Sequence, residues 1–195
     1  MVIPMKNKSV LMKLHLALMA LMMIGTIGAL AHFMIESSSA AGLSNPANAF
    51  LMLVILAMLI VGTLYLTKGY TKQAAVYYKL FLFLNVAVCV LTILIDLCFY
   101  HVNTWMVTIS ILNACKIILL LTMACGKDLG EKKTWTLFYM LLAADGLKLV
   151  LAIVNMIGVG FDFSFAGYVT ALISDGTIGL AIRGKYENKR NRGRI

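Results

Sequence analysis

Five ionisable residues lie inside long apolar stretches of this sequence, where charged side chains are rare. They are Asp96, Lys116, Asp145, Lys148 and Asp175. A charged side chain at the centre of a bilayer costs about 2.5–3.5 kcal/mol on insertion scales, so such groups usually face a bundle interior and pair, or line a wet cavity. Their types and positions therefore point to ion pairing, or to the binding of a polar solute, within a membrane.

The fifth apolar stretch has the most informative spacing. Asp145 and Lys148 are three residues apart, and Asn155 follows seven residues later, so the three side chains share one face of a helix. Asn113 and Lys116 are also three residues apart in the stretch before it. With Asp175 in the sixth stretch, these residues predict a polar interior shared by helices 4, 5 and 6. The predicted site residues are Lys116, Asp145, Lys148, Asp175, Asn113 and Asn155.

Two interpretations of this polar interior stay open at the level of sequence. In the first, it is a pathway or binding site, and its mixed charges suit a zwitterionic or anionic ligand or a proton-coupled step. In the second, pairs such as Lys116–Asp145 and Lys148–Asp175 fix the register of three helices, because buried ion pairs can specify an arrangement without adding stability.

The apolar stretches that position these residues dominate the composition. Hydrophobic residues make up 62% of the 195-residue chain and charged residues only 13%, which excludes an ordinary soluble domain. The sequence predicts an all-α polytopic transmembrane helix bundle of about six helices in three hairpins, with residues 1–182 forming the transmembrane domain. The predicted spans, each able to cross about 30 Å of hydrocarbon, are residues 9–35, 48–67, 77–99, 104–125, 135–158 and 162–182.

The positions of the basic residues predict the orientation. Apart from Lys116 and Lys148, every Lys and Arg lies at the N-terminus, after an even-numbered helix or in residues 183–195, and the other loops contain none. The positive-inside rule therefore predicts a multi-pass protein of the cell membrane with both termini inside, N-in and C-in. Residues 183–195 are predicted to form a basic cytoplasmic tail that can bind anionic lipid headgroups. The basic residues on that side are Lys6, Lys8, Lys13, Lys68, Lys72, Lys79, Lys127, Lys132, Lys133, Arg183, Lys185, Lys189, Arg190, Arg192 and Arg194.

Two patterns leave alternatives open. Gly69, Gly126 and Gly184 each stand beside a basic residue near the predicted end of an even-numbered helix. Their regular spacing suggests three stacked hairpins, although Gly is also a common helix C-cap. Separately, the basic N-terminus, the first apolar stretch and Ala29-Leu30-Ala31 resemble a cleavable signal peptide, and its removal would leave five spans.

The glycines and cysteines within the apolar stretches are predicted to serve helix packing, and His15 is predicted to lie at the membrane interface. Gly25-x-x-x-Ala29 in the first stretch and Gly176-x-x-Gly179 in the sixth would permit close helix contact, and His15 is expected at the membrane interface. The cysteines fall within or at the ends of apolar stretches and are expected to pack as small hydrophobic residues. They are Cys89, Cys98, Cys115 and Cys125.

The sequence carries no recognisable catalytic signature. It contains no H-E-x-x-H, G-x-S-x-G or P-loop motif, so an enzyme is not favoured, and no metal, cofactor or nucleic-acid site is expected. The sequence favours a small membrane transport or channel component that handles a polar solute or ion. The alternative is a non-transporting membrane subunit in assembly, immunity or sensing, bound to partner subunits or to a second copy of itself.

The layout of six helices with basic loops on one side is similar to that of the small substrate-binding subunits of energy-coupling-factor vitamin transporters. This resemblance implies a compact bundle that works with partner subunits of a multi-subunit transporter. It rests on layout alone, because no motif in the sequence extends it.

Overall fold

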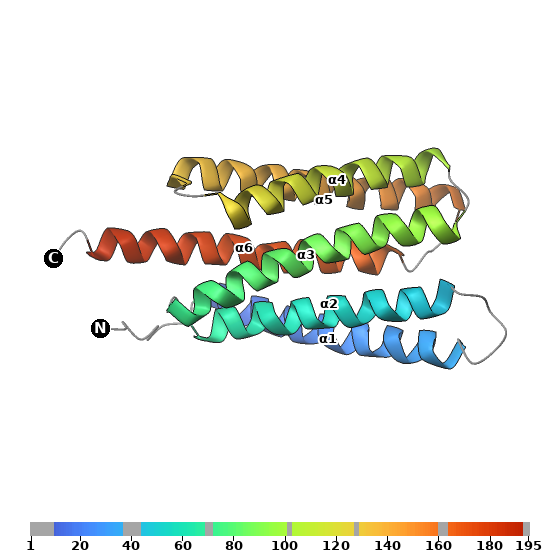
Figure 1. Ribbon diagram of the computed structural model, residues 1–195, viewed down its shortest axis with the longest axis horizontal. Helices are drawn as coiled ribbons and strands as arrows, with labels where there is room; N and C mark the ends of the chain where they lie inside the picture. The colour runs from blue at the N-terminus through green and yellow to red at the C-terminus, as the bar shows by residue number, and fades with distance from the viewer. Residues whose placement is uncertain are drawn as a thin grey trace.

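The computed structural model describes residues 10–36, 44–68, 72–100, 103–126, 129–159 and 164–192. Within those ranges every regular element is a helix, as predicted, and the helices run lengthwise through one bundle (Figure 1). Both chain ends lie at the same end of the bundle. The helices are α1 (Val10–Glu36), α2 (Ser44–Lys68), α3 (Lys72–Phe99), α4 (Thr104–Cys125), α5 (Glu131–Val159) and α6 (Ser164–Arg192).

Five of the described helices, α1 to α5, are long and apolar enough to cross a membrane. They correspond to the first five predicted spans, and the chain is accordingly a multi-pass membrane protein. The sixth predicted span also forms a helix, but α6 is not among the five. It continues to Arg192, so residues 183–192, which were predicted as a tail, extend the helix.

Helix α6 lies in the centre of the bundle, with α4 and α5 on one side and α1 and α2 on the other (Figure 1). Four of its residues in one stretch, Ser174, Asp175, Thr177 and Ile178, have no exposed surface. Polar side chains are tolerated here because protein, and not lipid, surrounds this part of the helix. Helix α6 is less apolar than the other five because it carries Ser174, Asp175 and Thr177 in this stretch and continues into the basic residues after 182.

Helix packing follows the chain and then closes on itself. Each helix packs against the next one, and α6 also packs against α1 and α2. Gly126 caps the C-terminus of α4 through its N–H, which donates to the Thr122 carbonyl at 2.9 Å. Gly184, in contrast, lies inside α6, and Gly69 is outside the described residues. The predicted glycine pattern therefore does not mark three helix ends.

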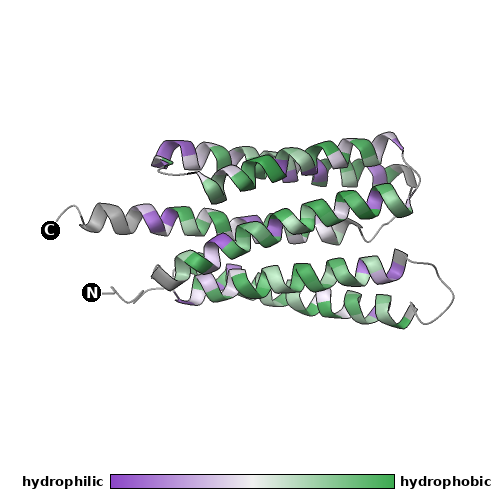
Figure 2. Cartoon of the chain, viewed as in Figure 1, coloured by the Kyte–Doolittle hydropathy of each residue, from purple (hydrophilic) through white to green (hydrophobic). Residues whose placement is uncertain are grey.

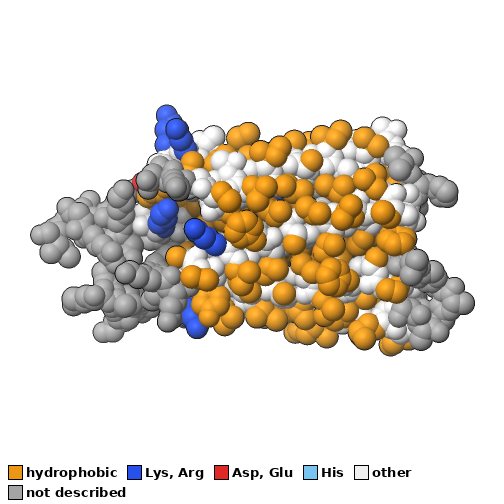
Figure 3. Space-filling view, in the orientation of Figure 1, with side chains coloured by type: hydrophobic (Ala, Val, Ile, Leu, Met, Phe, Trp, Pro, Cys, Tyr) orange, Lys and Arg blue, Asp and Glu red, His pale blue; other side chains and the backbone are white. Residues whose placement is uncertain are grey.

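Exposed Lys and Arg side chains gather at the end of the bundle that holds both termini, which we call the basic end (Figure 3). Between it and the opposite end, the surface is apolar and suits contact with lipid (Figures 2 and 3). The described exposed basic side chains are Lys13, Lys68, Lys79, Lys132, Lys133, Arg183 and Lys185. Lys6, Lys8, Lys127 and Arg194 lie outside the described residues, and the side chains of Lys72, Lys189, Arg190 and Arg192 are not described either.

The part of α6 beyond residue 182 packs on the turn between α4 and α5. The buried Tyr186 donates a hydrogen bond from its hydroxyl to the Leu129 carbonyl at 2.9 Å, and that hydroxyl lies 3.1 Å from Thr134 Oγ1. These contacts hold the continued helix against the bundle, which a flexible tail would not require.

The small residues of α6 permit close helix contact, as predicted. A Cβ atom added at Gly176 would lie 2.7 Å from His15 Cε1 on α1, and one at Gly179 would lie 2.5 Å from Phe138 Cζ on α5. His15 is half-buried against α6, with Nε2 3.0 Å from Thr177 Oγ1. For α1 the prediction is wrong, because nothing lies within 4 Å of a Cβ added at Gly25.

All four cysteines are free thiols, and only Cys89 is buried. Cys98, Cys115 and Cys125 are exposed. The prediction that all four pack inside is therefore wrong for these three, whose helix positions face the outside of the bundle.

Candidate functional site

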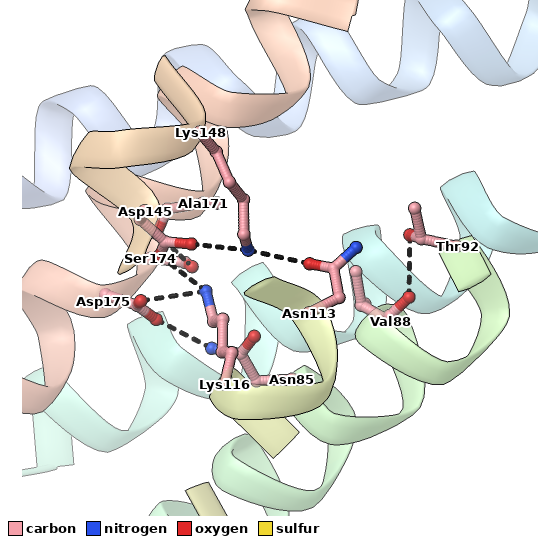
Figure 4. Close-up of polar contacts among 10 residues, drawn as sticks. All are labelled: Asn85, Val88, Thr92, Asn113, Lys116, Asp145, Lys148, Ala171, Ser174 and Asp175. Carbon is pink, nitrogen blue, oxygen red and sulfur yellow. Dashed lines mark hydrogen bonds and ion pairs between the residues drawn. The ribbon is translucent and has the colours of Figure 1, made fainter. Parts of the chain in front are cut away.

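Six polar side chains from four helices meet in the interior of the bundle (Figure 4). None of the six residues is more than 5% exposed. We call them the ionic layer: Asn85 of α3, Asn113 and Lys116 of α4, Asp145 and Lys148 of α5, and Asp175 of α6. The layer lies near mid-bundle, because Lys116 is ~18 Å from the start of α4 and ~14 Å from its end at 1.5 Å per residue.

Lys116 stands between the two carboxylates. Its Nζ donates a hydrogen bond to Asp145 Oδ2 at 2.7 Å and forms an ion pair with Asp175 Oδ2 at 2.9 Å. This one ammonium group therefore connects α4 to both α5 and α6. It is the shared centre that the sequence predicted for helices 4, 5 and 6.

Lys148 continues the network on the other side of Asp145. Its Nζ donates to Asp145 Oδ1 at 2.9 Å, within the same helix, and to Asn113 Oδ1 of α4 at 2.7 Å. The expected pair between Lys148 and Asp175 does not form, because Lys116 occupies the place beside Asp175. Asp145 is thus the carboxylate that both lysines share.

A neutral asparagine amide lies at each end of the network and turns toward its charged neighbour the group that can bond to it: an acceptor toward the ammonium, a donor toward the carboxylate. Asn113 presents its carbonyl oxygen to the Lys148 ammonium, and Asn85 donates from Nδ2 to Asp175 Oδ1 at 2.9 Å. The full chain of contacts runs Asn113, Lys148, Asp145, Lys116, Asp175, Asn85. Counted in their ordinary ionised forms, its two ammonium and two carboxylate groups carry no net charge.

The ionic layer differs from the predicted set of site residues in two positions: Asn155 is absent from it, and Asn85 is added. Asn155 is only half-buried and lies two helical turns beyond Lys148, or ~10 Å along α5, so it is not in the network. Asn85 was not predicted, since it stands alone in an apolar stretch without a charged neighbour. A single amide in an otherwise apolar span is the signal that could have found it.

One contact of the layer is an ion pair without the geometry of a hydrogen bond. Asp175 Oδ2 is buried and lies 2.9 Å from the Lys116 ammonium nitrogen, in an orientation that does not form a hydrogen bond. Asp175 Oδ1 and both oxygens of Asp145 do accept hydrogen bonds. Asp175 Oδ2 therefore depends on the charge of the ammonium that Asp175 shares with Asp145.

Neither a search for metal-ligand clusters nor comparison with known proteins assigns a ligand or a function to the ionic layer. Among the residues that the structure describes, no three His, Cys, Asp or Glu side chains gather closely enough to hold a metal ion. Comparison with protein-family models, curated proteins and solved structures found no match to this chain.

Proposed function

We propose that this chain is a small membrane transport component that moves a polar solute or ion through the ionic layer. The observation that supports this most directly is the Asp175 carboxylate, which has no exposed surface and shares the Lys116 ammonium with Asp145. Ionisable groups buried within a membrane bundle usually mark a solute, ion or proton pathway. A buried carboxylate that shares its ammonium partner with a second carboxylate is suited to take a proton or a polar group of a solute.

The neutrality of the layer sets a condition on what can enter it. A solute carboxylate would add one negative charge to a buried site, where an uncompensated charge is costly. Lys116 can turn from Asp175 to that carboxylate, and Asp175 can then bind one proton. One anion and one proton enter together, the site stays neutral, and the two fluxes are coupled one to one.

We place the basic end on the cytoplasmic side of the cell membrane, with both termini inside. The supporting observation is that the exposed Lys and Arg side chains gather at this one end (Figure 3). Anionic lipid headgroups are the natural partners of these side chains, each contributing about 1 kcal/mol near the surface.

The transport proposal can be tested in sealed liposomes that contain the purified chain and an entrapped pH-sensitive dye. A mixture of amino acids and small carboxylic acids is added outside with no membrane potential imposed, because the entry of one anion with one proton moves no net charge. We expect acidification of the interior that depends on both the protein and the mixture. Asp175→Asn should abolish it, because an amide cannot take up the proton.

The matched control is Asp96→Asn, which changes a half-buried carboxylate near the end of α3, away from the ionic layer. It should leave the acidification unchanged. Absence of acidification with the unchanged chain, or equal rates in the Asp175 variant, would count against the proposal.

A second candidate function is a non-transporting partner subunit, and the pairing of every charged group in the ionic layer favours it. Here Asp145→Leu combined with Lys148→Leu, which removes one charge of each sign, should preserve folding and association with another membrane protein. Under the transport proposal the same double variant should insert into the membrane and show no flux. The flux assay and co-purification of a partner therefore separate the two functions.

A further inference from the structure

A layer of large apolar side chains lies next to the ionic layer on the side of the basic end. One helical turn from Asn85, Lys116, Asp145 and Asp175, each of the four helices contributes one such side chain, and none has any exposed surface. We call them the apolar layer: Leu82 of α3, Leu120 of α4, Leu141 of α5 and Ile178 of α6. All four belong to one continuous core cluster of buried apolar side chains. The fully buried Thr177, whose Oγ1 lies 3.0 Å from His15 Nε2 of α1, precedes Ile178 on α6.

On the side of the opposite end, the same helices carry several smaller or more polar residues beside the buried Ile95 of α3 and Ile109 of α4. Thr92 lies two turns beyond Asn85 on α3, Asn155 two turns beyond Lys148 on α5, and Ser110 one turn before Asn113 on α4. All three residues are half-buried. Between them and the ionic layer lie the small buried residues Cys89 of α3 and Ala152 of α5.

Ser110 adds an independent observation on this side. Its hydroxyl is buried and has no hydrogen-bond partner. A helical hydroxyl can bond to the carbonyl four residues earlier, as Thr92 does to Val88 at 2.9 Å (Figure 4). Because the Ser110 hydroxyl does not, it remains available to a polar group that comes from outside the chain.

We infer that water and small hydrated solutes reach the ionic layer from the opposite end only, along Thr92, Ser110 and Asn155. The apolar layer closes the route from the basic end. This inference rests on the proposed function, and it adds the direction: the solute class is small and hydrated, carries a carboxylate, and loads from the side away from the basic residues. Movement toward the basic end then requires the apolar layer to separate.

The test measures which side of the membrane a thiol can be reached from. Ser110→Cys is introduced into a chain whose four native cysteines are replaced by Ala, and sealed vesicles of both orientations receive a membrane-impermeant cationic methanethiosulfonate. We expect modification of the Ser110→Cys thiol from the side of the opposite end and none from the side of the basic end. Lys185→Cys, exposed at the basic end, identifies that side in each preparation.

Two matched control thiols, one in the apolar layer and one facing lipid, test whether modification requires the inferred water route. Leu141→Cys in the apolar layer should stay unmodified from both sides. Native Cys115, retained alone, is exposed at the same depth as its neighbour Lys116 but faces the outside of the bundle, so it should also stay unmodified in lipid. Adding Leu141→Ala to Ser110→Cys should open a second route and permit modification from the basic end.

Modification of Ser110→Cys from the basic end alone, from both ends, or from neither would overturn the inference, as would reaction of Leu141→Cys. The outcome is independent of the proposed function, because the reagent needs water beside the thiol and no transport. A chain that passes the labelling test and fails the flux assay would keep one-sided access and lose the transport role.

Discussion

The ionic layer and the apolar layer are adjacent, equally buried and built by the same four helices, yet they depend on opposite physical effects. In the ionic layer, four charges have lost their contact with water and depend on one another, so removal of any one leaves a partner uncompensated. In the apolar layer, each side chain is stabilised only by close contact with its neighbours. Truncation of one side chain therefore leaves one cavity and no uncompensated charge. Burial alone therefore does not tell how a position responds to change.

The largest effect is expected for Lys116→Leu, which leaves the Asp175 carboxylate without its ammonium partner. We expect a loss of about 3–5 kcal/mol in the free energy of unfolding, the usual cost of breaking a buried pair. Unfolding in a titration with a denaturing detergent measures it. The double variant Lys116→Leu with Asp175→Leu keeps the layer neutral and should recover most of the loss, and an equal loss in both would show that charge compensation is not the cause.

An intermediate effect is expected in the apolar layer for Leu141→Ala. This change leaves a cavity at a residue with no exposed surface, at a cost of about 2–5 kcal/mol. The comparison variant is Leu147→Ala on the same helix, where the leucine is 48% exposed and lipid can fill the space. The same unfolding titration should show a clearly smaller loss for Leu147→Ala, and equal losses would mean that the apolar layer is not tightly packed.

The smallest effect should come from Gly179→Ala, next to Ile178 of the apolar layer. The added methyl group would meet the Phe138 ring at 2.5 Å, so α5 and α6 must separate slightly, and overpacking of this kind costs about 1–3 kcal/mol. Gly25→Ala on α1 adds the same atoms into open space and should leave the unfolding midpoint unchanged. A comparable shift in both variants would show that close packing does not hold α6 in place.

The contrast between the two layers also explains how far the sequence could be interpreted. Lys116, Asp145, Lys148 and Asp175 stand out because charges are costly in lipid, and that cost alone predicts that they meet. Leu120 and Leu141 cannot be told from a lipid-facing residue such as Leu147, because an apolar side chain is at home in either place. The apolar layer, on which the inferred direction of access depends, becomes visible only when the helices are assembled.

Two finer details were out of reach for a related reason. Whether Lys116 or Lys148 pairs with Asp175 depends on the rotation and depth of α6, which helix spacing does not fix. The packing of α6 against α1 and α2 was equally hidden, since hydropathy and residue spacing do not say which helices lie beside it.

That central, polar α6 has a consequence for how the protein is made. The ribosome releases α6 after the other five helices, so Lys116 and Asn85 are already in the bilayer when Asp175 arrives. A helix of this polarity would insert poorly by itself, and the earlier helices can offer it partners instead of lipid. We expect α6 to enter the membrane through contact with its predecessors, so that its arrival completes the network around Lys116.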